Sequence, residues 1–214
     1  METLERTAGA RANGEATVAP PRGDGFANHA LTSLLFTLVT VVLLGFAYPL
    51  AIGWIGAAVF PHQANGSIVQ SNGKPVGSDL IGQLWVKPQY FQGRPSAAGK
   101  GYDPTSTGGT NLAPTSKKLI DATKATIASL EKANPGASGK PPIDLVTSSG
   151  SGIDPDISPE SAYWQVPRVA AARKRTPDAI RAIVTAHVRG RMLGFLGEPR
   201  VNVFELNRAL DASP

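Results

Sequence analysis

Hydrophobic residues are concentrated in one uncharged stretch near the N-terminus. From Ala30 to Phe60 the chain contains no Asp, Glu, Lys or Arg. About 20 apolar residues suffice to cross a hydrocarbon core of roughly 30 Å. Thirty helical residues reach about 45 Å, so part of the stretch must tilt, kink or lie in the interface. The pattern predicts one transmembrane helix over residues 31–60. Pro49 is its natural kink point, because proline removes a backbone donor.

A cleaved signal peptide and a buried core helix are the two alternatives for this stretch. A signal peptide carries an apolar region of about 7–15 residues after a short basic start. The stretch here is roughly twice as long and follows a polar tail, which does not fit that design. Uncharged runs of this length are also rare in the cores of soluble proteins. A membrane span is therefore the favoured interpretation.

Small residues recur along one face of the predicted helix. Gly45, Pro49, Gly53 and Ala57 are spaced four residues apart. Small side chains let another helix approach closely, and such packing drives association in lipid. The alternative is that glycine is simply frequent in membrane helices. One crossing without ionisable residues cannot line an ion pathway, so any transport must belong to another subunit.

The polar remainder divides into a tail and a domain. Residues 1–30 have no apolar periodicity and are predicted to be a disordered extension. Residues 61–214 are predicted to form one extramembrane domain whose first half is rich in turn formers. Strands or extended pieces are expected at residues 67–70 and 80–86. Helices are expected from capping residues and apolar spacing at residues 115–132, 159–172, 177–189 and 203–210.

These elements define an α+β fold with a small irregular sheet and three or four helices. Ser158, Thr176 and Asn202 are the predicted N-caps of the last three helices. Pro167 predicts a kink or a shortened helix. The last turn of the third helix is expected to bury His187 and to end near Gly190.

Composition excludes several classes of function. The chain has no cysteine and only three histidines, so neither a disulfide nor a metal site is predicted. Beyond the uncharged stretch, eighteen Lys and Arg stand against twelve Asp and Glu. These cations are scattered apart from Arg173–Arg175, and no nucleic-acid-binding signature is present. We expect no nucleic-acid partner. Charge does not decide the orientation of the helix, because the residues flanking its two ends are balanced.

A glycine- and serine-rich segment is the most suggestive motif. Ser149, Gly150, Ser151 and Gly152 precede a predicted helix, where backbone N–H groups can bind a phosphate. The segment is not a Walker loop, because no Gly-Lys-Ser/Thr follows. The simpler alternative is a tight turn that leads into a capped helix. That alternative is favoured because an isolated glycine-rich turn is a weak signal.

Arg94 and His187 are two further candidates for a functional role. Arg94 either clamps a carboxylate or carbonyls of the loop, or is merely solvated. His187 lies on an apolar stripe, which indicates a packed histidine with one hydrogen bond. No nucleophile, base and orienter stand together in the pattern, so no catalytic residues are predicted.

The domain resembles the C subunit of the Kdp-type potassium-transporting P-type ATPase. The matching segments follow the order of that family and cover nearly everything from Leu31 to Asp211. They are Gly77–Gln83, Tyr90–Ser96, Gly108–Leu112, Asp144–Pro155, Ile157–Pro159, Gln165–Val169, Gly197–Val203 and Leu206–Asn207.

The resemblance implies a place in a multi-subunit complex. Its expected partners are a channel-like potassium-binding subunit, an ATP-hydrolysing P-type subunit, a very small fourth subunit and membrane lipid. It implies a single-pass protein of the inner (plasma) membrane, with a cytoplasmic N-terminus and an external domain. The family also implies a role in raising ATP affinity, with contact through Ser149, Gly150, Ser151, Gly152 and Gln165. No firmly bound cofactor is expected.

An external domain cannot meet cytosolic ATP, so these implications conflict, and the membrane topology is preferred. The leading hypothesis is an accessory, non-catalytic subunit that assembles and stabilises a potassium pump. The alternative is a membrane-anchored envelope enzyme or binding protein that acts alone.

Overall fold

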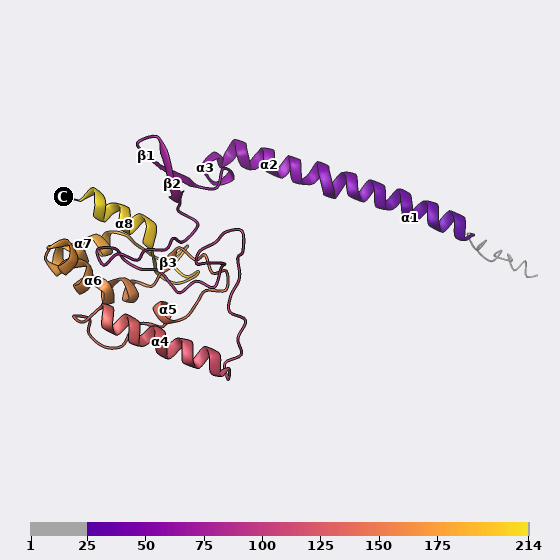
Figure 1. Cartoon of the computed structure of the whole chain (residues 1–214). Helices are drawn as coiled ribbons and strands as arrows, with labels where there is room; N and C mark the ends of the chain where they lie inside the picture. Colours follow the sequence, from indigo (N-terminus) through magenta and orange to yellow (C-terminus); the bar gives the residue numbers. More distant parts are fainter. Residues whose placement is uncertain (1–24, 214) are drawn as a thin grey trace, which may run out of the picture. The chain divides into compact units, whose positions relative to one another are not determined.

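The computed structural model describes residues 25–213. The prediction of a disordered extension over residues 1–30 falls largely outside this range. The chain divides between Ile55 and Gly56 into two compact units. The mixture of a long apolar helix with a domain of helices and short strands confirms the predicted fold class (Figure 1).

The N-terminal helix is continuous from Phe26 to Val59 and is 34 residues long. It consists of α1 (Phe26–Thr40), a π-helical segment η1 (Val41–Ala47) and α2 (Tyr48–Val59). The helical backbone thus begins before the predicted start at residue 31. Its most apolar window has a mean hydropathy of 2.3, and none of that window is buried. This length and composition fit a single pass through a membrane.

The π-helical segment lies directly before Pro49. In η1 the N–H of Tyr48 donates to the carbonyl of Leu43, five residues back. Proline has no N–H, and its ring clashes with the carbonyl four residues earlier in an α-helix. A π-bulge is one of the ways in which a helix accommodates such a break. A widened, π-helical turn therefore lies directly before Pro49, the residue at which the sequence predicts a kink.

The domain begins with a short helix and a hairpin. Helix α3 (Pro61–Ala64) leads into β1 (Ile68–Ser71) and β2 (Lys74–Ser78), which pair antiparallel. The connecting Asn72 and Gly73 both have positive φ, which matches the twist of a two-residue hairpin turn. No strand forms at residues 80–86, which leaves the second predicted alternative there, an extended segment without ladder partners. Gly82 instead donates to the carbonyl of Ile153 in a distant loop.

Five helices follow. They are α4 (Lys117–Ala133), α5 (Ile143–Val146), α6 (Pro159–Arg173), α7 (Pro177–Ala186) and α8 (Val203–Ala212). The predicted caps are confirmed, because Ser158, Thr176 and Asn202 each accept a bond from the backbone N–H three residues on. Helix α6 continues through Pro167 without being shortened. Helix α5 was not predicted.

Helix α7 ends earlier than predicted. Its last residue is Ala186, and His187 is its C-cap. The chain then enters β4 (Val188–Arg189), so Val188 pairs with Val201 and does not continue the helical stripe. The strand pairing satisfies backbone groups that a longer helix would have used internally.

A three-stranded antiparallel sheet lies beside these helices. Its order is β3 (Asp156–Ile157), β5 (Arg200–Asn202) and β4. Val201 in the central strand is fully buried. Complete burial of one such side chain contributes about 1.5–3 kcal/mol. The core cluster around it draws on α5 to α8, on β3 and on the loop that carries Phe91. Its other members are Leu145, Ile157, Ala162, Trp164, Val166, Val169, Ala170, Ile180, Val184, Val203, Leu206 and Leu210.

Candidate functional site

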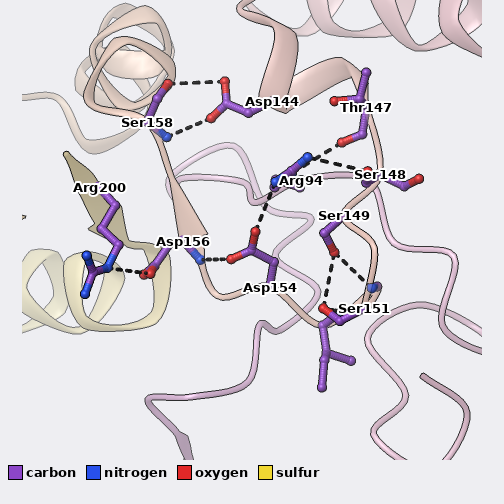
Figure 2. A network of polar contacts seen from close by, with 12 residues as sticks. Arg94, Asp144, Thr147, Ser148, Ser149, Ser151, Asp154, Asp156, Ser158 and Arg200 are labelled. Atoms are coloured by element: carbon purple, nitrogen blue, oxygen red, sulfur yellow. Dashed lines mark hydrogen bonds and ion pairs between the residues drawn. The ribbon is translucent and has the colours of Figure 1, made fainter. Parts of the chain in front are cut away.

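The glycine- and serine-rich segment folds as a tight, internally bonded turn (Figure 2). The hydroxyl of Ser149 accepts from the N–H of Gly152 at 2.9 Å. The hydroxyl of Ser151 accepts from the N–H of Ile153 at 3.3 Å. These two backbone donors are therefore engaged by the serines of the segment itself.

Gly152 is the point where three loops meet. Its φ of +71° favours glycine, and an added Cβ would lie 2.7 Å from the carbonyl oxygen of Gly108 and 2.8 Å from the N of Ala98. The carbonyl of Gly152 accepts from Ser96 Oγ at 2.5 Å. Gly108 in turn donates to the carbonyl of Ser151 at 2.8 Å. The segment thus holds the loops around residues 96–98 and 108 together.

Arg94 clamps this segment, as one of its two predicted roles requires. Its guanidinium lies 3.1 Å from Asp154 Oδ2 and also donates, at 3.4 Å, to the carbonyls of Thr147 and Ser148 (Figure 2). Both partners of the ion pair are about a quarter exposed. A carboxylate and two carbonyls fix the fork of a guanidinium better than they would fix a lysine.

Asp144 joins α5 to the start of α6. Its carboxylate accepts from the N–H of Ser158 at 2.7 Å and from the hydroxyls of Ser158 and Ser161. Figure 2 shows this carboxylate opposite the helix cap. Sequence reasoning missed this role, although Asp144 lies inside a segment that carries the family resemblance.

Asp156 is a half-paired, partly buried carboxylate in this network. Its Oδ2 pairs with Arg200 at 3.1 Å, while its Oδ1 is buried and has no hydrogen-bond partner among the described residues. Burial raises the pKa of Asp156, and the positive charge of Arg200 only partly opposes that shift.

Gln165 lies in a different network from the glycine- and serine-rich segment. Its side chain is 1% exposed and bonds to both backbone groups of Gln92, at 2.8 and 3.0 Å. Asn207 makes the same pair of bonds to Phe91, at 2.8 and 2.9 Å. These two amides act like a neighbouring strand for residues 91–92. Among the predicted contact residues, the structure brings Ser149 to Gly152 together and places Gln165 on the core side of α6.

Arg168 reinforces the same loop from α6. Its guanidinium donates to the carbonyls of Pro88 and Tyr90, at 2.6 and 2.9 Å, and to Asn134 Oδ1 at 2.7 Å. Burial lowers the pKa of Arg168 to about 10, so the group is still charged at neutral pH. A buried cation surrounded by neutral acceptors is costly to leave unpaired.

Tyr102 closes the other side of the loop region. Its hydroxyl donates to the carbonyl of Arg94 at 2.5 Å. Burial raises the pKa of Tyr102 to about 12, with the nearby charge of Asp154 adding to the shift. The ring fits against Gly93 because glycine has no Cβ; a Cβ at this position would lie only 2.5 Å from the tyrosine oxygen.

His187 is a packed histidine, as predicted. Its Nδ1 lies 2.8 Å from the carbonyl of Ile183, and the side chain is half-buried.

The small-residue face of the N-terminal helix is open. Within the described residues, no atom beyond the helix's own backbone and the residues next in the chain lies within 4 Å of a Cβ built on Gly53. A Cβ on Gly45 would meet only Val41 of the same helix, at 3.7 Å. A side chain added at Gly53 would therefore meet nothing else in the described chain.

Comparison with known proteins decides the family. The family model described as "K+-transporting ATPase, c chain" matches residues 30–212. The chain belongs to the KdpC family. A KdpC subunit of a potassium-transporting ATPase from Koribacter versatilis is 50% identical over 184 residues, which cover 86% of this chain and 94% of the relative. One from Caulobacter vibrioides is 50% identical over 186 residues, with 86% and 93% covered. One from Burkholderia orbicola is 52% identical over 181 residues, with 84% and 93% covered.

Membership of the KdpC family confirms the resemblance drawn from the eight sequence segments. Proteins of this family are subunits of a potassium-transporting P-type ATPase complex. The one long apolar helix of this chain fits a single membrane pass. The ATP contact through Ser149, Gly150, Ser151, Gly152 and Gln165 stays a prediction.

Proposed function

We propose that the chain is an accessory, non-catalytic subunit of an ATP-driven potassium import complex. Its role is to assemble and stabilise the channel-like potassium-binding subunit and the ATP-hydrolysing P-type subunit, together with a very small fourth subunit. The observation that carries this proposal is the row of small residues, Gly45, Pro49, Gly53 and Ala57, on one face of a helix of membrane-spanning length. A single uncharged helix cannot carry ions, but it can pack closely against helices that do.

The proposed setting is the inner (plasma) membrane, with the N-terminus in the cytoplasm and the domain outside. A long C-terminal domain can cross the membrane regardless of its own charge, so the basic character of residues 61–214 does not hold it inside. A domain without cysteine is compatible with an oxidising exterior.

Proteolysis of sealed spheroplasts tests this orientation. Protease added outside should remove the domain beyond Pro61, as followed by immunoblot. Protection of the domain until the membrane is permeabilised would reverse the orientation and would bring the domain within reach of cytosolic ATP.

We further propose that the glycine- and serine-rich segment acts as a packing centre of the domain. The support is its internal bonding: Ser149 and Ser151 engage two backbone donors, and Gly152 lies against Gly108 and Ala98. In this account phosphoryl transfer stays with the P-type subunit. The alternative is the role that the family resemblance implies, in which this segment raises ATP affinity. Variants of Gly150 and Gly152 distinguish that role from packing.

Co-purification tests the assembly role itself. A tag on this chain should recover the channel-like and ATP-hydrolysing subunits from detergent-solubilised membranes. A chain that extracts as a free monomer would instead support an anchored protein that acts alone.

A further inference from the structure

The arm between β4 and β5 ends in an apolar turn that nothing in the described chain covers. We call residues 192–196 the apolar tip, and residues 188–202 the arm. Leu193, Phe195 and Met192 are 79%, 68% and 63% exposed. Water-exposed leucine and phenylalanine side chains gathered on one turn are unfavourable unless a partner covers them. Scattered single apolar residues would need no such explanation.

The backbone of the tip is also held in a disfavoured conformation. Met192 and Leu196 exchange both backbone hydrogen bonds at 2.9 Å, and three residues turn between them. Leu193 has a φ of +54° and is followed by Gly194 with a φ of +84°. The left-handed conformation is unfavourable for leucine, and burial of the side chain does not offset that cost because Leu193 is exposed. An exposed apolar side chain and a disfavoured backbone conformation at the same residue are typical of a functional surface.

Two contacts support the arm that presents this tip. Arg191 and Glu198 pair across it at 2.6 Å, and Val201 at its base is fully buried in the core. A pre-formed projection loses little conformational entropy when it docks.

The charges of the arm argue against a lipid surface as the occupant. Each of its three arginines is paired with a carboxylate: Arg189 with Glu205, Arg191 with Glu198 and Arg200 with Asp156. Binding to anionic headgroups relies on cations that are free to meet them. Aromatic and methionine side chains within a charged rim are instead the pattern of a protein–protein contact.

The small size of the tip argues against a second copy of this chain. A stable interface buries about 800 Å² on each partner, far more than a five-residue turn can supply. A tip that entered a recess on another copy would also form a head-to-tail contact that does not close. A small contact suffices only where another attachment already holds the two proteins together.

We propose that the apolar tip docks into an apolar recess, bordered by polar groups, on the extramembrane surface of another subunit of the same potassium-transporting ATPase. This inference rests on the proposed function, because the N-terminal helix supplies the first attachment and raises the local concentration of the tip. The tip then fixes the position of the domain on the complex.

A single introduced cysteine tests the docking directly, because the chain has none of its own. Leu193→Cys is labelled with an environment-sensitive fluorophore in the full chain. Ile143→Cys, at a position 73% exposed on α5, is the matched control. Both are measured in lipid nanodiscs, alone and in complex with the other subunits, with water-soluble and lipid-borne quenchers.

The proposal expects the label at residue 193 to be shielded from the water-soluble quencher only in the complex. The lipid-borne quencher should have no effect, and the label at residue 143 should stay accessible. Quenching by lipid in the isolated chain would assign the tip to the membrane, and shielding that grows with chain concentration would assign it to a second copy. Either result overturns the proposal.

Wild-type assembly separates this inference from the proposed function. A complex that forms while the tip stays accessible would overturn the tip contact alone. Failure of the unlabelled wild-type chain to join the complex would overturn both.

A charge variant provides a second readout. Leu193→Asp combined with Phe195→Asp should raise the rate at which the full chain leaves the detergent-solubilised complex by about tenfold. Ile143→Asp should leave that rate unchanged. Thermal melting should be the same for all three proteins because the replaced side chains are exposed. An unchanged dissociation rate for the double variant contradicts the proposal.

Discussion

Gly150 and Gly152 lie in the same short segment but have different surroundings. A Cβ at Gly152 would meet Gly108 and Ala98, and the residue has a positive φ. Gly150 is exposed, and no atom of the described chain beyond its neighbours in sequence lies within 4 Å of its added Cβ. Gly152→Ala should therefore lower the free energy of unfolding by about 2–4 kcal/mol. Gly150→Ala should change it by less than about 0.5 kcal/mol.

Denaturant unfolding of the full chain in detergent measures both effects. The same two variants test the ATP contact. A packing role predicts that complexes carrying either variant keep the wild-type ATP affinity. A nucleotide contact predicts that Gly150→Ala, which adds bulk at the exposed glycine, weakens ATP affinity without loss of stability.

Asp156 and Asp103 should give opposite pH dependences. Burial raises the pKa of Asp156 in the folded state, so stability is lost as the pH rises from the unfolded pKa to the folded pKa, and the loss is complete above the folded pKa. The stability of Asp156→Asn relative to wild type should therefore rise between pH 4 and neutrality. Hydrogen bonds from Thr105 lower the pKa of Asp103, so its contribution is present above the unfolded pKa and is lost at lower pH. The stability of Asp103→Asn relative to wild type should therefore fall as the pH rises to about 4–5 and stay constant above it. A rise for both variants in chemical denaturation would refute the pKa assignments.

Single residues also show how far the sequence could be interpreted. The clamp by Arg94 was one of two alternatives, because arginine near glycine-rich loops commonly binds carboxylates or carbonyls. The hydrogen bonds of Gln165 and Asn207 could not be predicted from the sequence, because their backbone partners lie 73 and 116 positions away. A buried amide that replaces a strand leaves no periodic signal.

At the scale of elements, helix α6 is the organising piece of the domain. Arg168 ties it to the end of α4 through Asn134 and to the loop carbonyls of Pro88 and Tyr90. Arg168→Met should leave these acceptors unpaired and lower the free energy of unfolding by about 2–4 kcal/mol. Arg181→Met is the control, because Arg181 is exposed and only lies over the ring of Tyr163. Equal effects of the two variants in denaturant titrations would show that α6 is not held through Arg168.

The N-terminal helix gives a second prediction at this scale. Gly45→Leu with Gly53→Leu should reduce assembly of the complex about tenfold, because bulk on the small-residue face keeps a partner helix away. Insertion into the membrane should persist, since leucine favours it. Ala51→Leu, about half a turn from Gly53, is the control. Full assembly of the double variant in native gels would exclude this face as the interface.

Elements differed in how well the sequence predicted them. Three capped helices were found with their N-terminal residues because a cap is a local signal. The strands β3, β4 and β5 are two or three residues long, too short for alternation to be visible. Their pairing joins residues as distant as Asp156 and Asn202, which only the folded chain brings together. The extended segment at residues 80–86 has β-like composition, but no strand lies where it could pair.

For the whole molecule, the order of motifs was more informative than any single site. The long uncharged stretch and the eight segments predicted the membrane helix and the family, and the match over residues 30–212 confirmed the family. The position of the tip could not have been predicted, because exposure of Leu193 and Phe195 depends on where the arm folds. We propose that the chain assembles a pump in which other subunits transport potassium and hydrolyse ATP. Its orientation in the membrane and the docking of the apolar tip are parts of the same proposal.

The most direct test of the accessory role is to assemble the pump without this chain. The other subunits are expressed with the chain omitted, and potassium-stimulated ATP hydrolysis and complex size are measured after purification. If the chain assembles and stabilises the pump, no stable, active complex is recovered without it. Wild-type chain then restores the complex, and the Gly45→Leu, Gly53→Leu variant does not. A full-sized complex that hydrolyses ATP at the normal rate without the chain would show that the chain is not needed for assembly.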